Sequence, residues 1–459
     1  MNLISNYSSG FLKRDLFAGI TVAALLIPQG MAYALIAGLP PIYGLYAALT
    51  PQIIYALLGT SRQLAVGPVA LDSLLVATGL GALSIDDPSQ YILMAIFLAF
   101  LVGAIQLLMG LFRMGFIISF LSKPVIIGFT SAAAVIIGLS QLKHILGIEL
   151  SQSNQLHIFI QSLINSNSSV HFMTIIISIT SVVFILLIKK LNRKIPSALI
   201  AVILGILWVY FNGLDKQGVS VVGVIPEGLP SFQTPSFVVG SLKKLFPTAF
   251  TLALVAFMEA ISIGKTMEEK HKNYVIDPNQ ELIALGSANI IGSFFQSYPT
   301  TGGFSRTAVN DQAGAKTGVA ALVTALSVSI ILMFFTHWFY FLPKAVLASI
   351  IITAVINLVD FKFAIRLYKK RKDEFVILVI TFLATLFLGI TEGILLGILI
   401  SLLLLVYRAS MPHYAFLGRI GNTNYFKNVN RFPEEIIQRE DLIILRFDAQ
   451  LFFGNIQFF

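Results

Sequence analysis

Two polar side chains stand in the middle of long apolar runs, where burial of a charged or amide group costs free energy. Glu259 interrupts Leu254–Ile263, and Gln29 interrupts Ala24–Tyr33. A carboxylate inside such a run is usually retained for function, because it pairs with a cation or carries a proton. The alternative for both residues is a structural role, in which the side chain makes a hydrogen bond to a neighbouring helix.

After each of these polar positions the chain reaches a short segment broken by glycine and proline, first at Ala65–Ala70 and then at Tyr298–Thr307. Broken segments at matching places in two halves of a chain are typical of membrane sites that bind a small solute. We expect each to precede a half-helix whose free N–H groups and partial positive charge attract an anion without any metal. The alternative is a pair of ordinary helix kinks.

Ionisable and hydroxyl side chains accompany these segments. Ser305 can cap free N–H groups or donate to an anion. Arg306 stays charged and can attract anions over a distance, or it can pair internally with Glu259 or Asp72. Asp72 is expected one turn into the first half-helix, where it could bind a cation, carry a proton or pair with Arg306; the sequence leaves these three roles open.

The elements that must position these residues are membrane helices. The 459 residues are 56% hydrophobic and 12% charged, with a mean hydropathy of +0.85, whereas soluble chains are about 45–50% apolar and about 25% charged. The net charge of +9 fits an excess of cations on one side of a membrane, not a nucleic-acid surface. The absence of cysteine excludes disulfides and thiolate metal sites.

Hydropathy supports about ten to fourteen spans, because each needs roughly twenty apolar residues. With fourteen, the basic turns near Lys189, Lys265 and Lys362–Lys372 lie on the same side as both termini. The excess of Lys and Arg makes that side cytoplasmic. We therefore expect a multi-pass protein of a plasma membrane, a bacterial inner membrane in the first instance.

Several motifs resemble those of the sulfate permease (SulP) family: Ile27–Ala34 with Ala37–Tyr46, Val66–Ala70, Val221–Pro226 and Phe304–Asn310. The resemblance covers nearly the whole chain. It implies an all-α polytopic membrane protein with fourteen transmembrane segments in a seven-plus-seven inverted repeat, divided into core and gate domains. It also implies a homodimer, an elevator mechanism and a cytoplasmic α/β STAS domain.

These implications divide the chain into a first half at 1–211, a connecting loop at 212–244, a second half at 245–409, a linker at 410–436 and the start of a STAS domain at 437–459. Asp441–Asn455 resembles the opening strand and turn of that domain. A STAS domain needs roughly a hundred residues to close a core. We therefore expect the sequence to be a truncation or a fragment of a longer protein.

The resemblance also assigns roles. Positions matching Gln29 and Tyr33 contact the anion in the family, and an acidic residue at the position of Glu259 is tied to cation coupling, with glutamate typical of proton-coupled members. An acid at the position of Asp72 is unusual for the family. The predicted substrate-binding residues are Gln29, Tyr33, Val69, Ala70, Phe304, Ser305 and Arg306, and the predicted ion-coupling residues are Glu259 and Asp72.

The predicted function is secondary active transport of a small anion, sulfate first, by proton symport. The alternatives are a bicarbonate, chloride or dicarboxylate exchanger, a channel-like conductor, a sodium-coupled symporter, a carrier of uncharged nucleobases, or a non-transporting sensor. No catalytic residue, metal ligand or cofactor is predicted, because no catalytic or metal-binding motif is present. The expected partners are the anion, protons, the lipid bilayer and a second copy of the chain.

Overall fold

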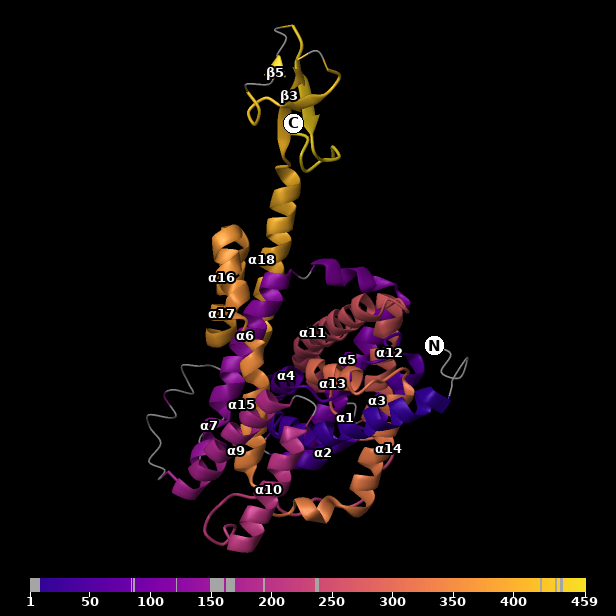
Figure 1. The fold of residues 1–459 in the computed structure, drawn as a ribbon, viewed down its shortest axis with the longest axis vertical. Coiled ribbons are helices and arrows are strands. Elements are labelled where there is room, and N and C mark those ends of the chain that lie inside the picture. Colours follow the sequence, from indigo (N-terminus) through magenta and orange to yellow (C-terminus); the bar gives the residue numbers. More distant parts are fainter. Residues whose placement is uncertain are drawn as a thin grey trace. The chain divides into compact units, whose positions relative to one another are not determined.

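The computed structural model describes residues 9–83, 85, 87–120, 122–148, 161, 170–192, 195–235, 239–421, 423–433, 436–437 and 441–459. The chain divides into two compact units, residues up to Leu396 and Gly397–Phe459. Helices dominate the first unit (Figure 1).

The helices before the connecting loop are α1 (Ser9–Ile36), α2 (Pro41–Ala47), α3 (Thr50–Leu58), α4 (Ala70–Gly81), α5 (Pro88–Leu111), η1 (Met114–Phe120), α6 (Lys123–Ser140), α7 (Leu142–Leu146), α9 (Phe172–Leu191) and α10 (Ser197–Asn212). Those after it are α11 (Val239–His271), α12 (Pro278–Ser293), α13 (Phe304–Gln312), α14 (Val319–Phe334), η2 (Thr336–Phe339), α15 (Lys344–Val355), η3 (Ile356–Leu358), α16 (Phe361–Lys370), α17 (Lys372–Phe387) and α18 (Ile390–Ser410).

The described residues contain seven helical stretches that are long and apolar enough to cross a membrane: Gly10–Ile36, Pro41–Leu58, Pro88–Leu111, Lys123–Leu146, Phe172–Leu191, Ser241–His271 and Ile390–Ser410. Shorter apolar helices include α4, α10, α14 and α15. The predicted all-α polytopic membrane fold is confirmed. The count of fourteen spans stays a prediction.

The helices of the first unit form two groups (Figure 1). α1 to α5 pack with α11 to α14, while α6, α7, α9 and α10 pack with α15 to α17. Small residues allow the closest crossings, since a Cβ on Gly103 of α5 would lie 2.7 Å from the Gly286 carbonyl oxygen of α12. The two groups meet where α1 lies against α10 and α15.

A two-stranded sheet joins the sequence halves inside the first group. β1 (Val66–Gly67) pairs antiparallel with β2 (Thr301–Gly302), with Val66 opposite Gly302 and Gly67 opposite Thr301. Both strands are fully buried. The ladder and the adjacent bond from the Gly303 N–H to the Ala65 carbonyl, at 3.0 Å, give partners to backbone groups that lie away from water.

The segment between the halves is bonded to the second half. Val222 N–H donates to the Leu342 carbonyl at 2.9 Å, and Gly228 N–H donates to the Leu332 carbonyl at 2.9 Å. An isolated bridge pairs Val221 with Pro343. The described part of the predicted connecting loop is therefore held against the second half from Val221 to Gly228.

The second unit contains strands β3 (Tyr414–Ile420), β4 (Phe426–Asn428), β5 (Ile436–Ile437) and β6 (Ile444–Phe447). β3 is central and pairs antiparallel with each of the others. β6 falls within the segment that resembles the start of a STAS domain. Residues 434–435 and 438–440, beside the predicted boundary at 436/437, lie outside the described residues. The STAS assignment and the domain boundaries stay predictions.

Candidate functional site

The two half-helices begin at the β1–β2 ladder. α4 follows Val69 directly and α13 follows Gly303, and because the strands are antiparallel the two helices leave the ladder in opposite directions. Neither N-cap residue makes a side-chain hydrogen bond to its helix. The first N–H groups of both helices thus keep their donor capacity beside the ladder.

The side chain of Arg306 links the two helix starts. It is 1% exposed and reaches back from α13, where its Nη1 donates to the Pro68 carbonyl just before α4, at 2.6 Å. Its Nε and Nη2 have no hydrogen-bond partner among the described residues. Gly303 makes room for the guanidinium, since a Cβ there would lie 2.6 Å from the Arg306 Cζ. A buried positive charge therefore adds to the partial charges of the helix N-termini.

Two carboxylates lie near this guanidinium. Asp72, in the first turn of α4, is 0% exposed, and neither of its oxygens has a partner among the described residues. Glu259 of α11 is half-buried, with Oε2 buried and similarly unpartnered. Both charges act electrostatically on Arg306 and on each other. No ion pair joins Arg306 to either acid in the described part of the chain, so it does not take the internal pairing that the sequence left open.

The predicted polar residues of α1, Gln29 and Tyr33, lie one turn apart on that helix. Gln29 and Tyr33 are each 5% exposed, and Gln29 Oε1 has no partner among the described residues. Tyr33 interacts electrostatically with Arg306 and Glu259. Tyr298 joins this group although it was not predicted, and its hydroxyl lies 3.1 Å from Ser73 Oγ of α4. Its position directly before Pro299 in the second broken segment was the only signal for it.

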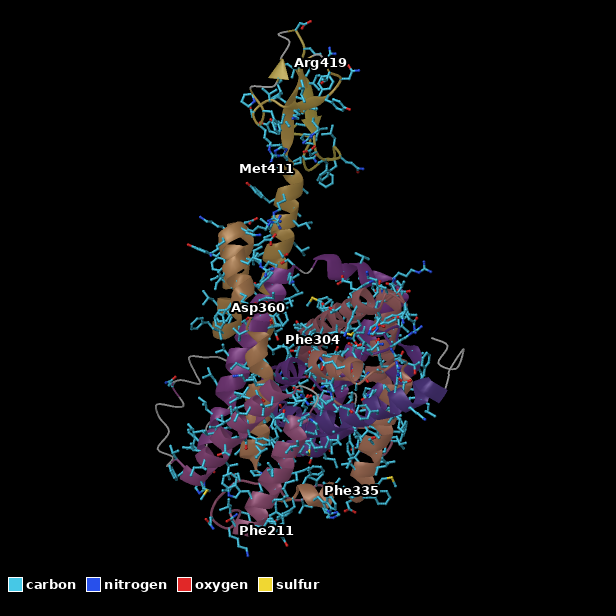
Figure 2. All side chains as sticks on the ribbon, viewed as in Figure 1. Phe211, Phe304, Phe335, Asp360, Met411 and Arg419 are labelled. Atoms are coloured by element: carbon cyan, nitrogen blue, oxygen red, sulfur yellow. The ribbon has the colours of Figure 1, made fainter. Side chains whose placement is uncertain are left out.

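The remaining predicted residues lie at the helix starts. Phe304 is 63% exposed and Ser305 is exposed, so the first turn of α13 is accessible, and Figure 2 labels Phe304 at this point. Val69 is half-buried, whereas the Ala70 side chain is 5% exposed and packs inside. The structure thus places the nine predicted residues on α1, α4, α11 and α13 and at the N-cap of α4.

Comparison with known proteins identifies the family. The family model described as "Sulfate permease family" matches residues 12–381. The chain belongs to the sulfate permease family. Two relatives from Arabidopsis thaliana are the probable sulfate transporter 4.2, 42% identical over 98% of this chain, and the chloroplastic sulfate transporter 4.1, 40% identical over 98%. Both are named as transporters, not enzymes. This sulfate permease chain spans 67% and 66% of their lengths, about two thirds.

Solved structures share the fold. The murine Solute Carrier 26 family member A9 anion transporter matches with a TM-score of 0.90 and 28% identity, covering 99% of this chain and 78% of that one. The transmembrane domain of the cyanobacterial transporter BicA matches with a TM-score of 0.73 and 23% identity, covering 86% of this chain and 98% of that one. At that identity the second match shows the fold alone.

In this sulfate permease chain, side chains outside the predicted site hold the backbone before β2. Asn289 of α12 accepts from the Thr300 N–H at 2.9 Å and donates to the Thr300 carbonyl at 3.1 Å. Thr301 Oγ1 donates to the Ala256 carbonyl of α11 at 2.6 Å. Sequence reasoning missed Asn289, because a lone asparagine in an apolar helix does not reveal its partner.

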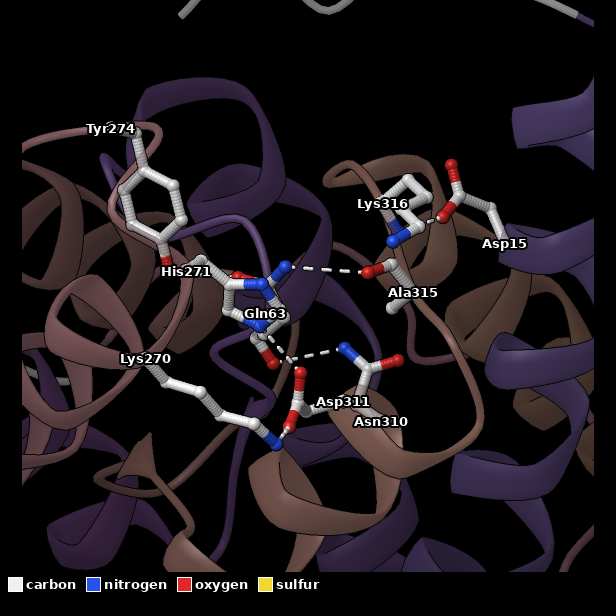
Figure 3. A network of polar contacts seen from close by, with 9 residues as sticks. All are labelled: Asp15, Gln63, Lys270, His271, Tyr274, Asn310, Asp311, Ala315 and Lys316. Carbon is white, nitrogen blue, oxygen red and sulfur yellow. Dashed lines mark hydrogen bonds and ion pairs between the residues drawn. The ribbon is translucent and has the colours of Figure 1, made fainter.

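A second missed network fixes the C-terminal end of α13 (Figure 3). Asp311 accepts from Lys270 and from His271, the latter at 2.6 Å, so α13 is tied to the end of α11. Asn310 Nδ2 donates to the Gln63 carbonyl at 2.9 Å. These contacts join the helix that carries Glu259 to the helix that carries Arg306.

Tyr274, in the loop after α11, extends this network. Its hydroxyl donates to Gln63 Oε1 at 2.7 Å. Burial raises the pKa of the Tyr274 phenol, so the hydroxyl keeps the proton that it donates. The loop before β1 is thereby held to the loop after α11.

Proposed function

We propose that this chain is a secondary active transporter of a small inorganic anion, with sulfate as the first candidate. The observation that carries the proposal is the buried β1–β2 ladder, which brings the starts of α4 and α13 together beside the Arg306 guanidinium. Free N–H groups at helix starts and a fixed positive charge favour an anion. The names of the relatives, sulfate transporters in plants and an anion transporter in mouse, support the same substrate class.

The anion would bind at the accessible first turn of α13. In this proposal the N–H groups of Phe304 and Ser305, together with those of Val69 and Ala70, surround it. The Ser305 hydroxyl is exposed there and can donate to an oxyanion. Arg306 would attract the anion without touching it, because its guanidinium is buried behind Gly303. Gln29 and Tyr33 would complete the site from α1.

Proton symport is the coupling that we propose, with Glu259 as the coupling residue. A bare carboxylate beside a bound anion repels it, so protonation of Glu259 would favour binding and movement of the loaded site. Glu259 Oε2 has no partner in the described part of the chain, which leaves it able to take up a proton. Asp72 would titrate with it, since the two charges act on each other.

The movement that we propose is of elevator type, in a homodimer with both termini cytoplasmic in a plasma membrane. The helix group of α1 to α5 and α11 to α14 holds every predicted site residue. It would shift as a body against the group of α6, α7, α9, α10 and α15 to α17. The Asp311 contacts support such a body, because they join α11 to α13.

The test is uptake of radiolabelled sulfate into proteoliposomes, with and without an inward proton gradient, for the wild type and Glu259→Gln. Uptake by the wild type should rise with the gradient, and Glu259→Gln should retain sulfate binding but lose that dependence. Sulfate uptake that does not depend on the proton gradient but requires an anion inside the vesicles would indicate exchange instead of symport. Failure to take up any anion in a folded preparation would remove the transport proposal.

Sodium coupling is the second candidate, and Asp72 is the observation that favours it. Two neighbouring carboxylates with unpartnered oxygens offer ligands to a cation, since oxygen ligands suit hard cations. A sodium gradient in place of the proton gradient tests this. Stimulation by sodium that Asp72→Asn abolishes would select it over proton symport.

A further inference from the structure

The helix between α15 and α17 combines cations with an uncovered apolar stripe. In Phe361–Arg371 and the following lysine, six residues are Lys or Arg and none is acidic. Its N-terminus is capped by Asp360, which accepts from the Phe363 N–H at 2.9 Å and is labelled in Figure 2. α16 is therefore a well-formed helix, not a basic loop.

Helical geometry sorts its side chains into three sectors, since each residue turns the position by about 100°. One sector holds Phe361, Ile365 and Tyr368, which are 73%, 56% and 58% exposed. The opposite side faces the protein through Leu367, which is 7% exposed. A third sector, between the apolar stripe and the opposite side, carries the cations Lys362, Arg366 and Lys369, while Lys370 lies on the side opposite the stripe.

The position of α16 places it at a membrane boundary. Phe363 lies under the ammonium of Lys123, at 5.3 Å from the ring centre, and Lys123 is the first residue of the apolar span that contains α6. The ring of Tyr368 packs edge-on against Phe375 in the first turn of the apolar helix α17, at 5.2 Å between ring centres. A helix fixed to the starts of two apolar helices lies where the hydrocarbon ends.

The cations of α16 are not neutralised by the protein. Lys362, Arg366, Lys369 and Lys370 form no ion pair with a carboxylate within the described ranges of the chain. Arg371 differs, since it pairs with Glu374 at 2.5 Å. An exposed apolar stripe beside a row of unpaired cations is the pattern of a helix that lies in a bilayer surface.

We propose that α16 is a binding surface for anionic phospholipids of the surrounding bilayer. Its stripe of Phe361, Ile365 and Tyr368 enters the acyl region, while Lys362, Arg366 and Lys369 hold the phosphates of lipid headgroups. Charge complementarity selects the lipid class, because a zwitterionic headgroup offers these cations no net negative charge. The proposal does not depend on which anion the chain transports.

The test measures contact between α16 and lipid by tryptophan fluorescence. The full chain carrying F361W is reconstituted into phosphatidylcholine vesicles that contain brominated phosphatidylcholine or brominated phosphatidylglycerol at equal mole fraction. The emission of the two native tryptophans is measured on the wild type and subtracted. F387W in the apolar helix α17 is the matched control, since Phe387 is 48% exposed.

Both brominated lipids should quench F361W, with phosphatidylglycerol stronger by at least about twofold because headgroup charge enriches it at the cations. Adding K362Q, R366Q and K369Q should equalise the two lipids. F387W should be quenched equally by both, with or without those changes. Quenching of F361W by aqueous acrylamide instead of lipid would overturn the proposal, because it would place the stripe in water. Quenching by neither would also overturn it, because it would place the stripe under protein. Equal quenching of F361W by the two lipids would overturn the headgroup selectivity.

Discussion

Gly303→Ala tests the packing of Arg306 against the start of α13. Gly303 has φ −96° and ψ 123°, a conformation open to alanine, so any effect comes from the added methyl group. That methyl would lie 2.6 Å from Arg306 Cζ and 2.7 Å from its Nη2. Carbon atoms pack at about 3.5–4.0 Å, so the guanidinium must withdraw by about 1 Å.

Withdrawal breaks the hydrogen bond from Arg306 Nη1 to the Pro68 carbonyl, which measures 2.6 Å. A hydrogen bond to a charged group contributes about 1.5–3 kcal/mol, and its loss leaves the buried guanidinium with no partner. We expect the thermal melting midpoint, followed by fluorescence-detected size exclusion in detergent, to fall, and sulfate uptake to fall with it.

Gly81→Ala is the matched control, because nothing lies within 4 Å of a Cβ at that position of α4. Gly81→Ala should leave the thermal melting midpoint unchanged or raise it, since alanine is more stable than glycine in a helix by about 0.5–1 kcal/mol. Arg306→Ala completes a double-mutant cycle, in which Gly303→Ala should have no further cost once the guanidinium is gone. An equal loss from Gly303→Ala in both backgrounds, or none in the wild type, would refute the packing argument.

Three further substitutions test the supports of the site. Asn289→Leu leaves the buried Thr300 N–H without a partner, which costs about 1–3 kcal/mol. Sulfate uptake should fall more than the yield of folded protein. Unchanged uptake would show that β2 does not need this support. Gly44→Ala puts a Cβ 1.9 Å from the Gly30 carbonyl oxygen, where the backbones of α2 and α1 are in contact. The yield of monodisperse protein should therefore be lost. A normal yield would contradict this close contact between the two helices. Asp311→Asn removes the carboxylate charge and one of its two acceptor oxygens, so at least one charged hydrogen bond is lost, which costs about 1.5–3 kcal/mol and should lower the melting midpoint. A wild-type midpoint would mean that the network of Figure 3 contributes no stability.

The sequence contained enough to assign the class, the family and the candidate residues. The length and composition of an apolar run reflect whether it lies in lipid or in water, so the membrane fold can be predicted by counting apolar residues along the sequence. Glu259 and Gln29 stand out because burying a polar group in an apolar run costs free energy, and the apolar residues on either side show that these positions are buried. Glycine and proline marked the two broken segments for the same local reason, since each disrupts a helix where it stands.

Only the tertiary structure decided which of these residues meet. The β1–β2 register pairs Val66 with Gly302, and no periodic pattern in either segment specifies that partner. The reach of Arg306 to Pro68 depends on this register and on the missing side chain at Gly303. The same holds for Asn289, whose helical position predicts burial but not the strand that it supports. Side-chain periodicity records which face is buried, whereas the partner across that face is set by packing between distant parts of the chain.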